Sequence, residues 1–253
     1  MTAMSDLVIV SDDGPVRTVR MNRPEKKNAL TVPMYEAMAD AIEDAAAEPA
    51  LRCIVIAGVP GAFCAGNDLQ DFLDASTHAE GLAPPLLRFL VTLGRAEKPL
   101  IAAVSGLAVG IGTTMLLHCD HVVAASDARF STPFVQLGLV PEASSSLLAP
   151  RRMGYARAFA LLAMGRSLDA AGAAAAGIVN SVVTPAEVDG EAMKAAREIA
   201  ALPAEALAIT RRLLRGSSDE AVERIEEEAD LFGARLASPE ARAAFAAFLA
   251  RKK

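Results

Sequence analysis

The stretch from Cys53 to Gly58, Cys-Ile-Val-Ile-Ala-Gly, sets the expectation for the fold. Five consecutive apolar residues followed at once by a glycine are typical of a strand buried on both faces. We expect further buried strands at 100–104 and 121–125, and a fourth strand at 178–183. Buried strands that alternate with helical segments indicate an α/β protein with a largely parallel sheet.

The segments around these strands complete the α/β pattern. Two short runs, 7–10 and 16–21, flank the turn signal Asp12-Asp13-Gly14 and predict a hairpin. Thr31 is placed to cap the helix that follows it. The segments expected to be helical are 31–48, 84–96, 112–118 and 144–164, with another beginning after Asp169.

After Thr184-Pro185 the sequence becomes helical throughout. Amphipathic patterns cover 186–201, 204–215, 218–236 and 239–250, separated by proline, glycine and serine. We therefore predict a core of residues 1–185 that carries the site and a C-terminal helical region of residues 186–253.

The composition excludes several classes of function. The formal net charge is −6, so attraction to nucleic acid or to an anionic membrane is not expected. Three cysteines without a CxxC pair argue against a disulfide framework and for a reducing cytoplasm. Neither a signal peptide nor an apolar run of the ~18 residues that a membrane span needs is evident.

Two glycine-rich turns follow buried strands and are candidates for an anion or oxyanion site. The first is Gly61–Leu69, Gly-Ala-Phe-Cys-Ala-Gly-Asn-Asp-Leu, and the second is Ser105–Thr114, Ser-Gly-Leu-Ala-Val-Gly-Ile-Gly-Thr-Thr. Each leads into a helix start, where backbone N–H groups are unpaired. Either turn alone is explained by tight backbone geometry. Together they can offer two N–H donors to one carbonyl oxygen.

Glu142 is the candidate acid, within the apolar stretch Phe130–Ser146. One interpretation places it near the start of a helix, where negative charge is favoured. The other makes it a general base in an apolar pocket, with a pKa raised by desolvation. The rest of the chain favours the second interpretation.

Other polar clusters have simpler explanations than catalysis. His118 and His121 lack further ligands for a metal, so we interpret them as basic residues at a helix end and predict no metal site. The run Ser144–Ser146 lacks a nucleophile elbow and is assigned to helix capping. The run Glu226–Glu228 is predicted to lie on a solvated helix face.

The order of these motifs resembles the crotonase superfamily, also called the enoyl-CoA hydratase/isomerase family. The matching pieces span most of the chain. They are Arg23-Pro24 with Asn28–Leu30, the two glycine-rich turns, Lys98-Pro99, Cys119-Asp120, Phe130–Glu142 and Gly177–Val179. The resemblance implies an α/β fold built as a spiral of ββα units, with a C-terminal helical trimerisation region. It also implies trimers or dimers of trimers.

The resemblance implies an acyl-CoA thioester as substrate, with coenzyme A as part of the substrate and no separate cofactor. The thioester oxygen would lie between the N–H groups of Asn67 and Ile111, where Ile111 replaces the glycine usual in the family. Lys26 and Lys27 would contact the CoA phosphates, with Arg23 as a further candidate. The remaining substrate-binding positions implied are Ala29, Ala65, Leu69, Thr114, Phe134 and Leu137.

Two departures from the family pattern bear on the reaction. Thr114 and Phe134 stand where hydratases of the family carry their two glutamates, so the usual pair for adding water is missing. Pro141-Glu142 instead looks like the peroxisomal-type Δ3,Δ2-enoyl-CoA isomerases, in which one glutamate is the base. A single carboxylate can move a proton from the α-carbon to the γ-carbon. We therefore predict an isomerase that uses Glu142. A degenerate hydratase, a thioester hydrolase and a non-catalytic acyl-CoA-binding protein are the alternatives.

Overall fold

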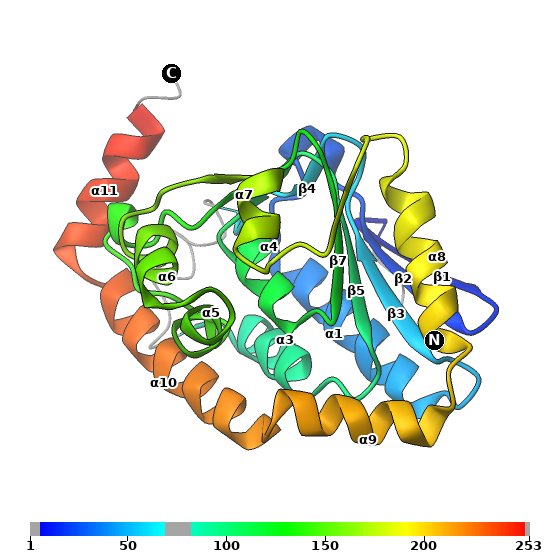
Figure 1. The fold of residues 1–253 in the computed structure, drawn as a ribbon. Coiled ribbons are helices and arrows are strands. Elements are labelled where there is room, and N and C mark those ends of the chain that lie inside the picture. The colour runs from blue at the N-terminus through cyan, green and yellow to red at the C-terminus, as the bar shows by residue number, and fades with distance from the viewer. Residues whose placement is uncertain (1–5, 69–81, 251–253) are drawn as a thin grey trace.

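The computed structural model describes residues 6–68 and 82–250, and its core is a six-stranded sheet with helices on both faces (Figure 1). The strand order is β1-β2-β3-β5-β7-β10, with β1 antiparallel to β2 and the other pairs parallel. The bounds are β1 Val8–Asp13, β2 Val16–Met21, β3 Cys53–Ala57, β5 Leu100–Val104, β7 His121–Ala125 and β10 Ser181–Val183. The predicted hairpin and the buried strands β3, β5 and β7 are confirmed. The fourth strand, predicted from 178, starts only at Ser181 and is partly exposed at the edge of the sheet.

A second, four-stranded sheet has the order β4-β6-β8-β9. Its strands are β4 Ala62–Cys64, β6 Leu107–Val109, β8 Arg129–Ser131 and β9 Leu168–Asp169. β3, β5 and β7 are each followed by a short strand of this second sheet. The chain therefore winds as a spiral in which each turn gives one strand to each sheet, and the predicted fold class is confirmed.

The two faces of the large sheet have different helical cover. On one face, alternate strand residues such as Cys53, Val55 and Ile101 pack with α8, Val188–Ala200. On the other face, Ile54 and Ile56 join the main core. That core includes α1 Val32–Ala47 and α3 Pro84–Arg95. Burial on both faces explains why β3 and β5 are apolar at every position.

The remaining helices follow the predicted segments with local breaks. Between β6 and β7 the chain forms α4, Ile111–Thr114, and the 3₁₀ helix η2, Met115–His118. Two further 3₁₀ helices are η1 Pro24–Lys26 and η3 Val135–Leu137. The others are α5 Ser145–Met153, α6 Tyr155–Leu162, α7 Ala170–Ala175, α9 Ala204–Arg215, α10 Ser218–Leu236 and α11 Pro239–Ala250.

Two details of the helices differ from the sequence expectation. The helix predicted over 144–164 is two helices, because Gly154 has φ 76° and interrupts the hydrogen-bonding pattern. Thr31 occupies the N-cap position of α1, but its hydroxyl makes no capping bond and is buried without a partner among the described residues.

Part of the predicted C-terminal region packs directly on the core. α8 covers the large sheet, and α10 lies along α3 (Figure 1). α9 is exposed along most of its length, with Leu213 75% and Leu214 83% exposed. The division of the chain at residue 185 stays a prediction.

Candidate active site

The two glycine-rich turns lie against each other at one edge of the small sheet. β4 and β6 are parallel neighbours, so the loops that follow them begin on the same side. A Cβ atom at Gly112 would lie 2.6 Å from the carbonyl oxygen of Cys64, and one at Gly66 would lie 3.1 Å from that of Val109. Glycine at these positions allows the two backbones to approach, which places Asn67 and Ile111 in adjoining loops.

The backbone N–H groups of Asn67 and Ile111 have no hydrogen-bond partner within the described residues. Ile111 is the first residue of α4, where an N–H group has no partner inside the helix. Its side chain is 1% exposed and belongs to the main core. The isoleucine therefore leaves its N–H group available while its side chain fills the interior.

Neighbouring bonds fix the Asn67 loop in place. Leu30 donates from its N–H to the oxygen of Gly66 and accepts from the N–H of Asp68, both at 2.8 Å. The hydroxyl of Tyr35 in α1 donates to the side-chain oxygen of Asn67. Asn28, fully buried, donates to the carbonyl oxygens at both 62 and 63 from its side chain. The local sequence does not indicate this role for Tyr35, although the residue lies on the buried stripe of α1.

Glu142 lies in a turn between η3 and α5 and is 3% exposed. Its Oε1 accepts a hydrogen bond of 2.5 Å from the hydroxyl of Thr114, a residue of the second glycine-rich turn. Burial raises the pKa of Glu142 to about 8; the Thr114 bond opposes this rise, and the nearby carboxylate of Glu228 adds to it. A carboxylate with such a pKa can exchange a proton near neutral pH.

The backbone after Glu142 adopts a conformation that L-residues rarely take. Ala143 has φ 58° and Ser144 has φ 54°, and neither is glycine. Ser145 bonds back to the carbonyl of Glu142 through both its N–H group, at 3.0 Å, and its hydroxyl, at 2.6 Å. Strained turns of this kind persist where the surroundings determine them, and they occur often at functional sites.

This turn bears on two interpretations made from sequence. Glu142 is near the start of a helix, three residues before α5. Ser144 occupies the N-cap position, but its hydroxyl is buried without a partner among the described residues, so it does not cap α5. An acid from another helix bonds to the first turn of α5. It is Glu228 of α10, whose Oε1 accepts a hydrogen bond from the N–H of Ser146 at 2.9 Å.

The acidic run in α10 is therefore only partly a solvated face. Glu226 and Glu227 are exposed, whereas Glu228 is 4% exposed. Glu228 is three residues after the buried Ile225 and four before the buried Phe232. That helical spacing places it on the buried stripe, and it is the signal that could have identified the residue.

The segment that leads to Glu142 is apolar and packs into the main core. Phe134 is 5% exposed and packs edge-to-face on Phe232 of α10, with ring centroids 6.5 Å apart. Leu139 is buried, and Leu137 and Val140 are partly buried against the same core. Glu142 itself is 3% exposed, so water has little access to it in this structure.

The predicted CoA-binding residues lie in the loop next to the Asn67 turn. Lys26 and Lys27 are exposed, and the carbonyl of Lys27 accepts from the N–H of Ala65 at 3.0 Å. The guanidinium of Arg23 already bonds within the protein. It pairs with Asp68 at 2.6 Å and donates to the carbonyl of Ala29. Ala29 and Ala65 are half-buried in these loops. Leu69, also predicted to bind substrate, lies outside the described residues.

His118 is not the helix-end cation expected from the sequence. It is 1% exposed, and burial lowers its pKa to about 4, so the ring is neutral at pH 7. Its Nε2 atom lies 2.7 Å from the carbonyl oxygen of Ala143. Over residues 6–68 and 82–250, no group of three or more His, Cys, Asp or Glu side chains is placed to hold a metal ion.

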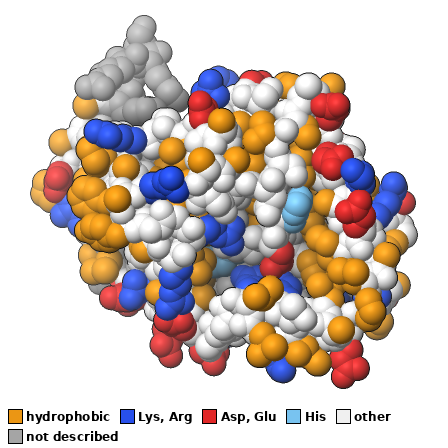
Figure 2. All heavy atoms as spheres, viewed as in Figure 1, with side chains coloured by type: hydrophobic (Ala, Val, Ile, Leu, Met, Phe, Trp, Pro, Cys, Tyr) orange, Lys and Arg blue, Asp and Glu red, His pale blue; other side chains and the backbone are white. Residues whose placement is uncertain are grey.

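Charged side chains of both signs share the surface. On the face shown in Figure 2, acidic and basic side chains are interspersed with hydrophobic ones, and some basic side chains lie in a recessed region near its centre. None of the described helices is both long and apolar enough to cross a membrane.

Comparison with known proteins defines the class. The family model for enoyl-CoA hydratase/isomerase matches residues 12–253, so the chain belongs to this family, the crotonase superfamily. It is 32% identical over 249 residues to a probable enoyl-CoA hydratase of Rhizobium meliloti, covering 98% of this chain and 96% of that protein.

Two further relatives show how the chain compares in length and structure. Enoyl-CoA delta isomerase 2 of Rattus norvegicus is 35% identical over 250 residues, a match that covers 97% of this chain but only 64% of the rat protein. The structure of Pseudomonas aeruginosa OdaA superposes with a TM-score of 0.92 at 42% identity, covering 97% of this chain and 99% of that one. Relatives named as hydratases and as isomerases thus both occur.

Proposed function

We propose that this protein is a Δ3,Δ2-enoyl-CoA isomerase with Glu142 as its only acid/base. The observation that carries the proposal is a buried carboxylate, Glu142, whose Oε1 accepts a hydrogen bond from Thr114, a residue of the same short helix as the Ile111 N–H donor. Thr114 and Phe134 occupy the positions where the resemblance expects the two hydratase glutamates. Neither side chain can activate a water molecule as a base.

The reaction would proceed in two proton transfers. Glu142 takes a proton from the α-carbon of a 3-enoyl-CoA, and the electrons delocalise into a dienolate whose charge rests on the thioester oxygen. The N–H groups of Asn67 and Ile111 would stabilise that oxyanion, and each such donor is typically worth about 3 kcal/mol. Glu142 then returns the proton to the γ-carbon, which leaves the double bond between the α- and β-carbons.

The environment of Glu142 favours isomerisation over hydration. Glu142 is buried and follows an apolar segment that includes Phe134 and Leu139, and a dry environment of this kind would limit water near the reacting carbons. The same burial raises the pKa of Glu142 to about 8, so the acid is a stronger base than an exposed glutamate and still gives the proton back near neutral pH.

Binding and assembly are part of the proposal. Lys26 and Lys27 would contact the phosphates of CoA, and Ala29, Ala65 and Leu69 would line its path, with no separate cofactor. We infer a homotrimer or a dimer of trimers in the cytoplasm. The exposed leucines of α9 support an assembly, because apolar side chains so exposed in one chain are commonly covered by a partner.

The test compares wild type and Glu142→Gln on two substrates. We expect the wild type to isomerise a 3-enoyl-CoA and barely to hydrate a 2-enoyl-CoA. We expect the variant to lose isomerisation by about 100-fold or more. Glu226→Gln on the exposed face of α10 is the matched control and should behave as wild type.

A hydratase-like or hydrolytic enzyme is the second candidate, because relatives of nearly full coverage include a probable enoyl-CoA hydratase. Hydration of 2-enoyl-CoA or thioester hydrolysis that survives Glu142→Gln would favour it. Binding of acyl-CoA without turnover of either substrate would indicate a non-catalytic binding protein.

A further inference from the structure

The segment of α4 and η2 touches the Glu142 turn at two points. Thr114, near its middle, bonds to the carboxylate of Glu142, and His118, at its end, contacts the carbonyl oxygen of Ala143 through Nε2 at 2.7 Å. Ile111, at its start, is the proposed oxyanion donor. One short segment thus connects the proposed oxyanion site with the base and with the residue directly after it.

The His118 contact anchors the strained part of the turn. Ala143 and Ser144 both have positive φ, so the carbonyl of Ala143 points in a direction that an unstrained chain would not choose. A buried carbonyl needs a hydrogen-bond donor. The ring of His118 supplies it from inside the core.

The chemistry of the ring settles which nitrogen carries the proton. A carbonyl oxygen only accepts, so Nε2 must be the donor. Burial keeps the ring neutral by lowering its pKa to about 4, which leaves Nδ1 without a proton. Nδ1 is buried and has no partner within the described residues. The ring therefore makes one directed contact, and that contact is with the Glu142 turn.

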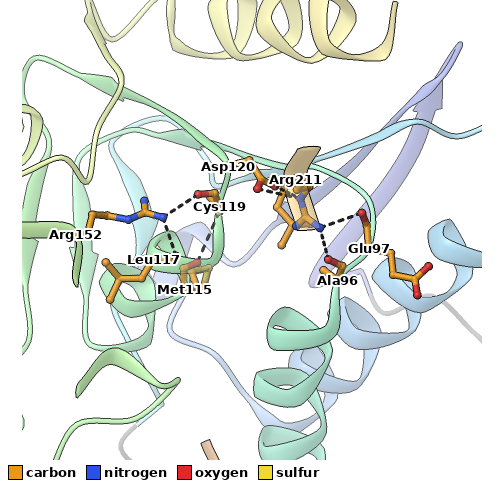
Figure 3. A network of polar contacts seen from close by, with 9 residues as sticks. Ala96, Glu97, Met115, Leu117, Cys119, Asp120, Arg152 and Arg211 are labelled. Carbon is orange, nitrogen blue, oxygen red and sulfur yellow. Dashed lines mark hydrogen bonds and ion pairs between the residues drawn. The ribbon is translucent and has the colours of Figure 1, made fainter. Parts of the chain in front are cut away.

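Hydrogen bonds from Arg152 hold the backbone on both sides of His118. The Nη2 atom of Arg152 donates to the carbonyl oxygens of Leu117, at 3.0 Å, and Cys119, at 3.4 Å (Figure 3). Asp120 accepts from the N–H of Leu100 at 2.9 Å and from Arg211. Because its flanking residues are held, His118 presents its ring from a rigid position.

We propose that His118 is a positioning residue for Glu142, holding the carbonyl of Ala143 so that the carboxylate keeps its place relative to the oxyanion donors. This inference rests on the proposed isomerase function. His118 contacts backbone and not the reacting atoms, so its effect is on geometry. A displacement of the base of about 1 Å can reduce the rate by up to about 100-fold.

Two substitutions separate the hydrogen bond from the bulk of the ring. His118→Gln keeps an N–H donor at a similar reach, whereas His118→Leu removes it and keeps a side chain of moderate size. With a 3-enoyl-CoA we expect His118→Leu to lower kcat by about 10- to 100-fold with KM nearly unchanged. His118→Gln should recover most of kcat.

The outcomes distinguish this inference from the proposed function. A wild type that does not isomerise 3-enoyl-CoA contradicts the proposed function itself. An active wild type with a fully active His118→Leu overturns the role of His118. The same holds if both variants fold but Gln is as impaired as Leu, or if KM rises while kcat is unchanged.

A measurement on the wild type covers the case in which the variants do not fold. The chain has three histidines, so ring-nitrogen NMR with His78→Gln and His121→Gln identifies the His118 signals by elimination. We expect a neutral ring with the proton on Nε2 from pH 6 to 9. A proton on Nδ1, or a charged ring in this range, overturns the proposal.

Discussion

Two buried ionisable side chains, Glu142 and Arg211, are held near opposite ends of the segment from Ile111 to Asp120, and their environments differ. Arg211 of α9 is 9% exposed, pairs with Asp120 at 2.9 Å and donates to the carbonyl oxygens of Ala96 and Glu97 (Figure 3). Glu142 accepts one side-chain hydrogen bond, from Thr114, and has a second carboxylate, Glu228, nearby.

The difference separates a structural charge from a reactive one. Burying a charge is costly unless hydrogen bonds and an opposite charge compensate for it. Around Arg211 an acidic partner and two carbonyl oxygens supply that compensation, and these contacts tie α9 to the core. Around Glu142 it is small, and the acid responds with a raised pKa. Perturbed acids of this kind are commonly found at functional sites.

The largest expected effect is on stability at high pH. The pKa of Glu142 is about 8 in the folded chain against an ordinary value of 4.5, so the folded state binds the extra proton between these values. Wild type should therefore lose stability as the pH rises through this window. Glu142→Gln should not share this loss. Its free energy of unfolding relative to wild type should rise by at most about 1.4 kcal/mol per pH unit and level off above pH 8.

Urea unfolding at pH 5, 7 and 9, at one protein concentration, measures this difference. Glu226→Gln is the control, because its side chain is exposed and its effect should stay within about 0.5 kcal/mol. A difference in free energy of unfolding between Glu142→Gln and wild type that is the same at all three pH values would show that burial does not raise the pKa of Glu142.

Removing the charge of Arg211 should lower the stability of the protein, whereas removing that of Glu142 should raise it at high pH. Arg211→Met leaves the carbonyls of Ala96 and Glu97 without their donor and Asp120 without its partner, so the free energy of unfolding should fall by about 1–3 kcal/mol. Arg212→Met, at an exposed neighbour, is the control, and equal losses for both variants would contradict the assigned role.

Thr114→Val removes the hydroxyl that donates to Glu142 and keeps the shape of the side chain. Because that hydrogen bond lowers the pKa of Glu142, its loss should raise the pKa further and reduce kcat/KM at pH 7 by about 10-fold. Thr114→Ser keeps a hydroxyl and should stay near wild type. Steady-state kinetics with a 3-enoyl-CoA measure both variants. If Thr114→Val is as active as Thr114→Ser, the hydrogen bond from the hydroxyl to Glu142 has no role in the reaction.

Glu228→Gln should have the smallest effect. The amide oxygen can still accept from the N–H of Ser146, but the negative charge near Glu142 is gone. The pKa of Glu142 should therefore fall, and the rise of kcat/KM with pH should move to lower pH. A pH profile beside that of Glu226→Gln checks this, and a shift to higher pH would contradict the like-charge interaction.

The sequence predicted the elements with strong patterns. The apolar runs at 53–57, 100–104 and 121–125 became strands at the predicted residues, and the C-terminal helices follow the predicted segments within a few residues. The short strands β4, β6 and β8 were not predicted, because runs of three residues give no recognisable periodicity. They form the second sheet, which brings the two glycine-rich turns together.

The candidate site was predictable where its chemistry depends on residue type. Glu142, Asn67 and Ile111 follow from the resemblance and from glycine placement. His118 and Glu228 did not follow from local sequence, because their roles depend on a turn 25 residues and 82 residues away, respectively. Local rules assigned a charged His118 to a helix end and Glu228 to solvent. His118 does end η2, but burial keeps its ring neutral, and packing buries Glu228.

The most direct test of the account is the pH dependence of kcat/KM for the conversion of a 3-enoyl-CoA to the 2-enoyl-CoA. A single buried carboxylate that acts as the base predicts a rate that rises with pH and levels off above an apparent pKa near 8. The rise should be absent from any residual activity of Glu142→Gln. A wild-type profile that is flat between pH 6 and 9, or that is already complete near pH 5, would contradict the claim that Glu142 is a weakly compensated buried acid that performs the reaction.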